Sequence, residues 1–349
     1  MSEGKSAAKR PTVRDIAAHA GVSVATVSRI LNGAYQAPQA THEKVMRAVQ
    51  DLDYRTSTTR ALTTLTGTIA VGIPHMRSQY YMAIGSGIEE QARTAGLGVL
   101  LSTTAGHPEQ ELQLVDMMLQ RGVEAVILIG GIEERADHQA ALANRAHALD
   151  RGGSRLVLCG RPWQGPPDAP VSVVNYDAEA AGYAATTYLL SNGHRRIAHL
   201  GGPNRYATGM LRARGYRRAL DDFGVEFDEA LIATARMDRE AGIYYGRKLL
   251  TQTDATAIFA ANDEQAAGII AAARAEGRSM PEELSLMGFD DTLLARDLYP
   301  ALTTLHVPQL EMGRAAARMA MYRDDQAEQR LEIGTHVVVR DSVRRVALN

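Results

Sequence analysis

The hydrophobic positions of residues 67–290 follow two alternating patterns. Short apolar runs rich in Val, Ile and Leu predict buried strands, and the stretches between them have the apolar spacing of amphipathic helices. The runs in the first part are TIAVGI, GVLLSTT, EAVILIG, RLVLCG and VSVVNYD, and the later runs are RIAHLGG, LIATA, AIFAAND and LSLMGFD. Alternation of this kind predicts an α/β protein with parallel sheets covered by helices on both faces.

This series divides into two doubly wound halves. Near the C-terminus, LTTLHVPQLEMGRAAARMAMY predicts a return to the first half, and THVVVR predicts a final strand in the second. We therefore expect a first lobe of about 67–174 plus 306–333 and a second lobe of about 175–305 plus 334–349. Three crossings make a hinge, and the cleft between such lobes is where ligands bind.

Residues 12–33 have a different pattern, that of two short helices joined by a tight turn. Thr12 and Asp15 have the spacing of a capping box at the start of the first helix. Gly21 supplies the turn, and Ser23 is placed to cap the second helix. The spacing predicts a helix-turn-helix.

The second of these helices has an outer face suited to DNA. Val27, Ile30 and Leu31 are spaced to face inward. The outer face keeps small apolar groups, which can contact thymine methyls, and a hydroxyl. It also keeps an arginine, which can bind phosphate or guanine. These outer residues are Val24, Ala25, Thr26 and Arg29. Taken alone, the pattern also fits an ordinary helical hairpin with a glycine turn.

The string AGVSVATVSRILNG resembles the headpiece signature of the lactose-repressor/galactose-repressor (LacI/GalR) family of bacterial transcription factors. The similarity continues through THEKVMRAVQDLDY to Tyr54 and returns in later motifs, so it covers nearly the whole chain. It implies a DNA-binding headpiece over residues 1–54, followed by a body like a periplasmic sugar-binding protein. Ala37-Pro38 and Thr41-His42 depart from the family's usual Val-Ser and Thr-Arg pairs, and we expect them to remove one helix cap and one or two phosphate contacts.

Residues 55–66, a Thr-rich stretch, read as a linker. The resemblance implies a hinge helix that forms on operator DNA and inserts a leucine into the minor groove. Leu62 is our candidate and Leu65 the second, although Leu62 could instead pack on the core. The predicted DNA-binding residues are Thr12, Ser23, Val24, Ala25, Thr26, Ser28, Arg29, Asn32, Tyr54 and Leu62.

The candidate effector residues of the core follow the carboxyl ends of the predicted strands, where doubly wound sheets bind ligands. They are Tyr80, Tyr81, Thr208, Arg212, Met237, Asn262, Asp263 and Asp290. The resemblance implies that the matching Arg, Asn and Asp positions contact the small-molecule effector. Arg212 can donate to vicinal hydroxyls or a carboxylate, and Asp290 can accept from two hydroxyls, so a sugar is favoured.

Several of these candidates have a structural alternative. Asn262 or Asp263 could be the N-cap of the helix that begins there. One of Tyr80 and Tyr81 could serve packing, and Asp291 fits solvent or a hinge better than a ligand. Met237 stands where relatives carry an aromatic ring, so ring stacking would have to come from Tyr80, Tyr81 or Trp163. A nucleoside, a sugar acid or another polar metabolite stays open as the effector.

Composition and charge fit a regulator in two parts. The 349 residues are 45% hydrophobic and 22% charged, enough for two or three domains. The net charge of −2 combines +4 over residues 1–66 with −6 over the rest, so the basic end is the part that would meet phosphate. Cys159 lies in an apolar run and predicts a buried strand residue. With neither a membrane span nor a signal peptide in the sequence, we expect a cytoplasmic protein.

Motifs of common enzymes do not occur in the sequence. The glycines form no dinucleotide fingerprint or P-loop, and there is no G-x-S-x-G, HExxH or CxxC. His194 matches a structural family motif, while His75, His107 and His306 lack metal-ligand spacing. We expect no catalytic residue, no metal and no cofactor.

The sequence thus predicts a sequence-specific DNA-binding regulator, a repressor, that binds operator DNA as a homodimer and switches with a small effector. Closure of the lobes on the effector would shift the population between DNA-binding states. One alternative is a regulator that responds to a nucleoside, a purine or a sugar acid. Another is a ligand-binding protein without a DNA role.

Overall fold

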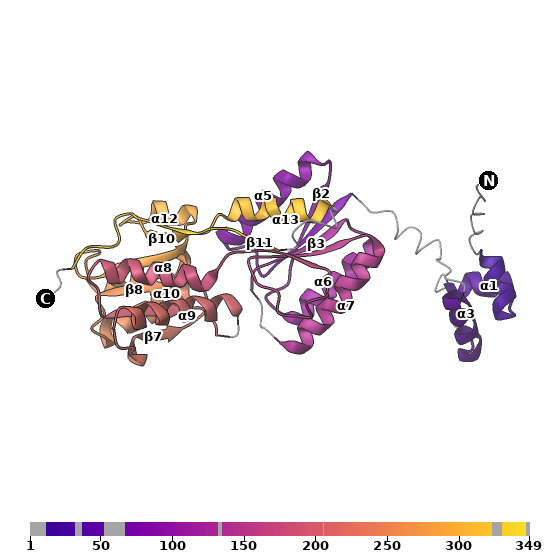
Figure 1. Ribbon diagram of the computed structural model, residues 1–349, viewed down its shortest axis with the longest axis horizontal. Helices are drawn as coiled ribbons and strands as arrows, with labels where there is room; N and C mark the ends of the chain where they lie inside the picture. Colours follow the sequence, from indigo (N-terminus) through magenta and orange to yellow (C-terminus); the bar gives the residue numbers. More distant parts are fainter. Residues whose placement is uncertain are drawn as a thin grey trace, which may run out of the picture. The chain divides into compact units, whose positions relative to one another are not determined.

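The computed structural model describes residues 12–31, 37–51, 67–131, 135–204, 206–322 and 330–346. The chain forms two units, Met1–Leu65 and Thr66–Asn349. Figure 1 shows their helices and strands and labels many of them.

The N-terminal unit is a small helical bundle. Its helices are α1 (Val13–Ala20), α2 (Val24–Leu31) and α3 (Gln39–Asp51). A single apolar core joins them, made of Ile16, Ala17, Val27, Ile30, Val45 and Ala48. Because full burial of a Val or Ile side chain contributes only about 1.5–3 kcal/mol, the helix caps matter for a core of this size.

The second unit begins with a six-stranded sheet in the order β11-β5-β4-β3-β1-β2, in which every pairing is parallel. Its strands are β1 (Thr68–Ile73), β2 (Gly98–Thr103), β3 (Ala125–Ile129), β4 (Arg155–Cys159), β5 (Val171–Asn175) and β11 (Arg330–Glu332). Its helices are α5 (Gln79–Thr94), α6 (Pro108–Arg121), α7 (Ala136–Gly152) and α13 (Gln309–Met321). We call these elements the first lobe.

Alternate residues of these strands face opposite helix layers. Val71 and Ile127 belong to the apolar cluster that includes α5 and α13, whereas Ala70 and Val126 belong to the cluster that includes α6 and α7. Figure 1 shows the first-lobe strands between their helices. Burial on both faces explains why these strands are continuous apolar runs.

A second six-stranded sheet has the order β12-β10-β9-β8-β6-β7. Its strands are β6 (Ile197–Gly201), β7 (Ile232–Thr234), β8 (Ala257–Ala260), β9 (Ser285–Asp290), β10 (Thr303–His306) and β12 (His336–Val338). Its helices are α8 (Ala178–Ser191), α9 (Ala207–Asp222), α10 (Arg239–Gln252), α11 (Asp263–Ala275) and α12 (Leu293–Asp297), with a 3-10 turn at Glu229–Leu231. These elements form the second lobe.

The predicted α/β class with a helical headpiece and two sheets is confirmed. The chain passes between the lobes at 176–177, at 307–308 and at 333–335. Two details differ from the sequence expectation. Strand β12 is antiparallel to β10, and β11 is an edge strand that was not predicted. The reason is that β11, with the sequence Arg-Leu-Glu, lacks the apolar run that identifies a buried strand.

Candidate functional site

The capping pattern predicted for the headpiece is confirmed. Thr12 and Asp15 form a capping box, in which the Thr12 amide donates to Asp15 Oδ2 at 2.6 Å. Gly21 ends α1 with a φ of 66°, a left-handed conformation that glycine adopts without strain. The Ser23 hydroxyl oxygen accepts from the Thr26 amide at 3.1 Å at the start of α2. These caps fix the turn that separates the two helices.

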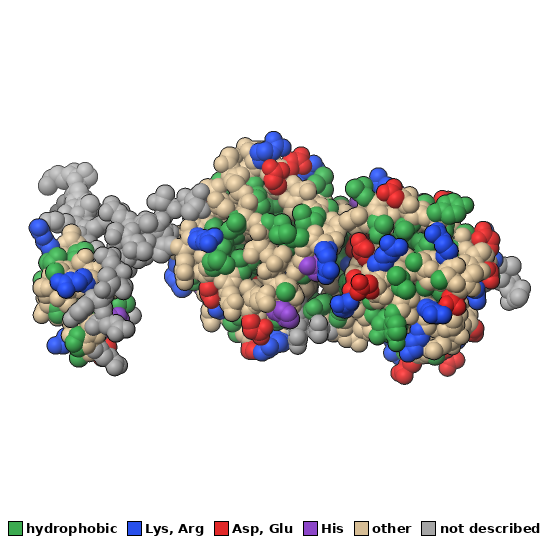
Figure 2. All heavy atoms as spheres, turned by 180° about the vertical axis from the view of Figure 1, so that it is seen from behind, with side chains coloured by type: hydrophobic (Ala, Val, Ile, Leu, Met, Phe, Trp, Pro, Cys, Tyr) green, Lys and Arg blue, Asp and Glu red, His purple; other side chains and the backbone are tan. Residues whose placement is uncertain are grey.

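Helix α2 buries one face and exposes the other. Val27 and Ile30 are buried, while Val24 is 45% exposed. Of the other predicted DNA-binding residues, Thr12, Ser23, Ala25, Ser28 and Arg29 are exposed and Thr26 is half-buried. On the face of this unit shown in Figure 2, the charged side chains are mainly Lys and Arg. A helix with an apolar, hydroxyl-bearing and basic outer face can dock in a major groove.

Three of the predicted DNA-binding residues, Asn32, Tyr54 and Leu62, lie outside the described residues, as does Leu65. At the departure Ala37-Pro38, the Pro38 carbonyl accepts the first backbone hydrogen bonds of α3, from the Thr41 and His42 amides at 2.8 and 3.0 Å. Proline has no side-chain acceptor, so it cannot supply the side-chain cap that the family usually carries there.

Arg212 lies at the centre of a buried polar cluster in the second unit. It is carried by α9 and is 4% exposed. Its Nη1 donates to the Ala261 carbonyl at the end of β8, and its Nη2 donates to Tyr176 Oη at 2.6 Å and to Asp290 Oδ1 at 3.4 Å. The guanidinium carbon stands 3.6 Å from the centre of the Phe289 ring. Residues at the ends of three strands, β5, β8 and β9, therefore orient this arginine.

Asp290 ends β9 beside Arg212, and its backbone φ of 101° is unusual for a residue with a side chain. Such backbone strain is often found at functional sites. Burial raises the pKa of the Asp290 carboxyl to about 8, and the neighbouring Arg212 opposes that rise. Gln309 Nε2, just beyond the second crossing, donates to the Asp290 carbonyl. The carboxyl is thus held at a strand end, next to a segment that joins the lobes.

Tyr80 and Tyr81 bring the first lobe to this cluster. Both lie in the first turn of α5, their rings meet edge to face at 5.6 Å, and both interact electrostatically with Arg212 and Asp290. Burial raises the pKa of each hydroxyl. Whether one of the two tyrosines serves packing alone stays a prediction.

Thr208 lies in the first turn of α9 and Met237 in the loop before α10, and both are half-buried. Thr208 Oγ1 faces Gly131 of the first lobe, where a Cβ atom would lie 3.3 Å away. The Met237 side chain packs against Gly202, and its carbonyl accepts from Asn262 Nδ2 at 3.1 Å. Met237 thus fills the space beside β6 with an apolar side chain.

The structure gives Asn262 and Asp263 partners within the chain. Asn262 is the N-cap of α11 and accepts from the Gln265 amide at 2.9 Å. Asp263 accepts from the Thr292 amide at 2.7 Å and from Thr304 Oγ1 at 2.6 Å, and burial raises its pKa to about 6. Both are predicted effector residues, and of the two Asn262 is the N-cap, while Asp263 bonds to Thr292 and Thr304 within the chain.

Asp291 is not at the solvent, and both of its carboxylate oxygens have partners within the chain. It is buried, forms an ion pair with Arg340 Nη2 at 2.5 Å and lies in hydrogen-bond contact with His306 Nδ1 at 2.9 Å. His306 ends β10 immediately before the second crossing. The hinge alternative for Asp291 therefore fits these contacts.

The sequence reasoning missed Tyr176, Phe289 and Gln309 as members of the cluster. Tyr176 directly follows β5, so the same rule that selected the other strand ends would have found it. Phe289 and Gln309 carry no such signal, because one reads as a strand residue and the other as the first residue of an apolar-faced helix.

Other residues considered for chemistry have structural roles. His194 Nδ1 pairs with Thr256 Oγ1 at 2.9 Å and its Nε2 with the Arg344 carbonyl at 3.2 Å. Cys159 is buried, and burial raises its pKa to about 12. Over the described ranges, no group of three or more His, Cys, Asp or Glu residues could hold a metal ion. Within the same ranges, every helix is too short or too polar to span a membrane.

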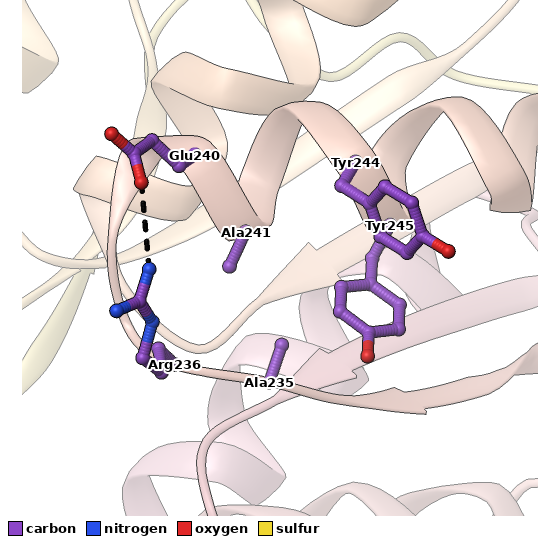
Figure 3. Close-up of a pocket in the computed structure, with 6 residues that line it drawn as sticks. All are labelled: Ala235, Arg236, Glu240, Ala241, Tyr244 and Tyr245. Carbon is purple, nitrogen blue, oxygen red and sulfur yellow. Dashed lines mark hydrogen bonds and ion pairs between the residues drawn. The ribbon is translucent and has the colours of Figure 1, made fainter.

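A separate surface hollow of about 310 Å³ lies beside β7 and α10 (Figure 3). Arg236 and Glu240 form an ion pair at 3.4 Å on one side, and the rings of Tyr244 and Tyr245 stand on the other. It contains none of the candidate effector residues. We therefore place the candidate site at the polar cluster, where charged groups are oriented and shielded from water.

A helix-turn-helix in one chain with a two-lobed core and a buried polar cluster defines the class of ligand-controlled DNA-binding regulators. Residues 12–57 match the family model of bacterial regulatory proteins of the lacI family, and residues 186–343 match a periplasmic binding protein-like domain. The chain belongs to the lacI family and is a DNA-binding transcriptional regulator. The predictions of family, fold and regulator class are confirmed.

Individual relatives are similar over nearly their whole length. The HTH-type transcriptional regulator DegA of Bacillus subtilis (strain 168) is 33% identical over 338 residues, covering 95% of this chain and 98% of that protein. The HTH-type transcriptional repressor PurR of Vibrio vulnificus (strain CMCP6) is 28% identical, covering 96% and 99%. A solved structure, described as a transcriptional regulator CelR-cellobiose complex, has a TM-score of 0.69 at 32% identity and covers 95% of this chain and 100% of that one.

Proposed function

We propose that the chain is a repressor that binds operator DNA as a homodimer and is controlled by a sugar or sugar derivative. The observation that carries this proposal is the buried pair of Arg212 and Asp290 at the strand ends of the second lobe, with Tyr80 and Tyr81 of the first lobe beside it. A guanidinium and a carboxyl can together donate to and accept from hydroxyls, and aromatic rings can pack on an apolar sugar face.

The sugar class also draws support from a relative. A solved CelR structure at 32% identity is described as a complex with cellobiose. Cellobiose, a neutral molecule with many hydroxyls, suits the donors and acceptors of the cluster. A nucleoside, purine or sugar acid remains the second candidate, because Arg212 could also bind a carboxylate.

The effector residues that we propose to contact the sugar are Tyr80, Tyr81, Thr208, Arg212, Met237 and Asp290. Tyr80 and Tyr81 come from the first lobe, and the other four come from the second. An effector held by both lobes would stabilise the closed arrangement, and differential affinity for two arrangements is all that a ligand needs to shift their populations.

We propose that residues 1–54 bind the operator and that residues 67–349 bind the effector and form the dimer. Residues 55–66 would link these two parts. The proposed contacts with DNA are Thr12, Ser23, Val24, Ala25, Thr26, Ser28, Arg29, Asn32, Tyr54 and Leu62. Leu62 would be the minor-groove wedge, which unstacks a base step and bends the duplex. A symmetric dimer would match a near-palindromic operator.

We propose no catalytic role, since the relatives named above are transcriptional regulators. A regulator that binds the chromosome would act in the bacterial cytoplasm. No cofactor is part of the proposed mechanism.

A mobility-shift titration tests this function. The purified full chain would be mixed with the DNA upstream of its own gene, with and without cellobiose, other sugars and nucleosides. We expect a specific complex whose affinity changes with a sugar. If no upstream DNA binds more tightly than random DNA, the proposed DNA role is wrong, and a response to a nucleoside alone would replace the sugar by the second candidate.

A further inference from the structure

The hydroxyl of Tyr176 lies at the first crossing between the lobes. Tyr176 follows β5 of the first sheet and precedes α8 of the second lobe. It is 1% exposed, and its Oη accepts from Arg212 Nη2 at 2.6 Å. A hydrogen bond between a hydroxyl and a charged guanidinium is stronger than a hydrogen bond between two neutral groups.

The donors of Arg212 show what this contact does. Nη1 is held by the Ala261 carbonyl, while Nη2 reaches both Tyr176 and Asp290. Nε is buried and has no hydrogen-bond partner among the described residues. Of the contacts to Nη2, the one to Tyr176 is the shorter, at 2.6 Å against 3.4 Å for Asp290. The hydroxyl therefore holds Nη2, while the Ala261 carbonyl holds Nη1.

The position of α9 contributes to this geometry. A Cβ atom at Gly182 of α8 would lie 2.9 Å from the Arg212 Cα atom, so only a glycine permits this approach of the two helices. Tyr176 lies two residues before α8 begins. Helix packing and the Tyr176 hydroxyl together define where the guanidinium stands.

The other side of Tyr176 leads to the first lobe. The side chains of Tyr176 and of Tyr80 on α5 belong to one buried cluster, and their hydroxyls interact electrostatically. The Tyr80 hydroxyl in turn lies over Gly160 after β4, where a Cβ atom would be 3.0 Å away. A tyrosine hydroxyl can accept one hydrogen bond and donate another, so Tyr176 can serve both lobes at once. Tyr80, Tyr176, Arg212 and Asp290 form a continuous chain of contacts across the crossing.

From this chain of contacts we propose that Tyr176 is a positioning residue of the effector cleft. Its hydroxyl orients Arg212 for the effector and ties that arginine to Tyr80, so that it couples the occupancy of the cleft to the closure of the lobes. The effector part of this inference rests on the proposed function, in which Arg212 binds the sugar. The closure part concerns the protein without any ligand and can be tested by itself.

The variant Tyr176→Phe removes the hydroxyl and keeps the ring, whose centre lies 6.1 Å from that of Phe289. A matched control is Tyr216→Phe. Tyr216 lies in the same unit and is also 1% exposed. Its hydroxyl donates to the carbonyl of Ile197 at 2.8 Å, and Ile197 begins β6, at the end of that strand away from the cluster. A loss of folding stability alone would affect both variants.

The first measurement uses the full chain without ligand. Nitroxide labels at Gln120→Cys on α6 and Asp222→Cys on α9 would report the distance between the lobes, because both positions are exposed and Cys159 is buried. In the parent protein we expect one main distance. Tyr176→Phe should add a second distance with a severalfold larger population than in the parent, and Tyr216→Phe should not. An identical distribution in Tyr176→Phe and the parent would overturn the closure role.

The second measurement is calorimetry with cellobiose and the sugar panel. We expect Tyr176→Phe to weaken sugar binding about tenfold. Adding Tyr80→Phe to that variant should cause little further loss of sugar affinity, because both residues act through one chain of contacts. Unchanged sugar affinity in Tyr176→Phe would overturn the positioning role. A further outcome is that the parent binds no sugar while the nitroxide labels of Tyr176→Phe still show the second distance. In that case the proposed effector class is wrong and the closure role of Tyr176 stands.

Discussion

The two binding regions of this chain differ in how their functional side chains are held. On α2, Ala25 and Arg29 are exposed, and Val24 is 45% exposed. In the core, Arg212 and Asp290 are 4% and 5% exposed and contact each other across 78 positions of sequence. A DNA-reading face needs only a helix with the correct side turned outward. An effector site needs partners from several elements, so its residues acquire a role only through the fold.

The largest expected effect comes from breaking the buried pair. Arg212→Ala would leave the Asp290 carboxyl and the Tyr176 hydroxyl without their shared partner, and we expect a loss of about 3 kcal/mol in the free energy of unfolding. Operator binding without effector should stay near the parent value, while the response to effector is lost. Denaturant unfolding and an operator titration measure the two quantities.

The control for that prediction is Arg214→Ala on the same helix. The Arg214 side chain is 66% exposed and pairs with Glu179 at 3.5 Å. Its removal should change stability by less than about 0.5 kcal/mol. Equal losses in both variants would mean that the buried cluster has no special role in this lobe.

The second prediction concerns the exposed face. Arg29→Ala should weaken operator binding by about 1–3 kcal/mol, because an arginine in the groove contributes a specific base contact or a phosphate contact. Effector binding by the core should be unaffected. Fluorescence anisotropy with labelled operator measures the loss, with Arg93→Ala on α5 as a control whose side chain is 70% exposed. Parent-like operator affinity would remove Arg29 from the DNA-binding face.

A pH titration sharpens the contrast further. The pKa of Asp290 in the folded chain is about 8, above the ordinary value of 3.8, so the folded state binds the proton more tightly than the unfolded state. Its contribution to stability is fully present below about pH 4 and is lost as the pH rises through 8. Between pH 6 and pH 7 this amounts to at most about 1.4 kcal/mol.

The variant Asp290→Asn isolates that contribution. Asp263 and Glu264, which lie near Asp290, and Arg212 are present in both proteins, so the difference in slope belongs to Asp290. Unfolding by urea at several pH values should give a flatter pH dependence for Asp290→Asn. The same slope in both proteins would contradict the raised pKa of this carboxyl.

The smallest expected effect lies at the headpiece cap. Thr12→Ala removes the hydroxyl that accepts from the Asp15 amide, and such caps contribute about 1 kcal/mol. Hydrogen exchange of the α1 amides in the full chain should become correspondingly faster. Thr251→Ala on α10 is the control, because its hydroxyl bonds to the Arg247 carbonyl inside a helix and caps no helix start. Unchanged exchange in α1 would show that the capping box does not stabilise this unit.

The sequence alone was sufficient where local rules decide the structure. The capping box at Thr12, the turn at Gly21 and the strand from 68 to 73 follow from spacing and periodicity. It was insufficient where a side chain has competing partners. Nothing local tells whether Asn262 caps α11 or faces a ligand, and the bonds of Asp263 to Thr292 and Thr304 join residues 29 and 41 positions apart. The role of Phe289 under Arg212 depends on packing of the same kind.

An operator titration can separate the DNA-binding face from the effector site when Arg29→Ala and Arg212→Ala are compared with the parent, each with and without the sugar that the parent binds. We predict that Arg29→Ala loses affinity for the operator in both conditions. Arg212→Ala should keep the parent's affinity without sugar and show no change when sugar is added. An Arg212→Ala protein that still responds to the sugar as the parent does would contradict the assignment of the buried cluster as the effector site.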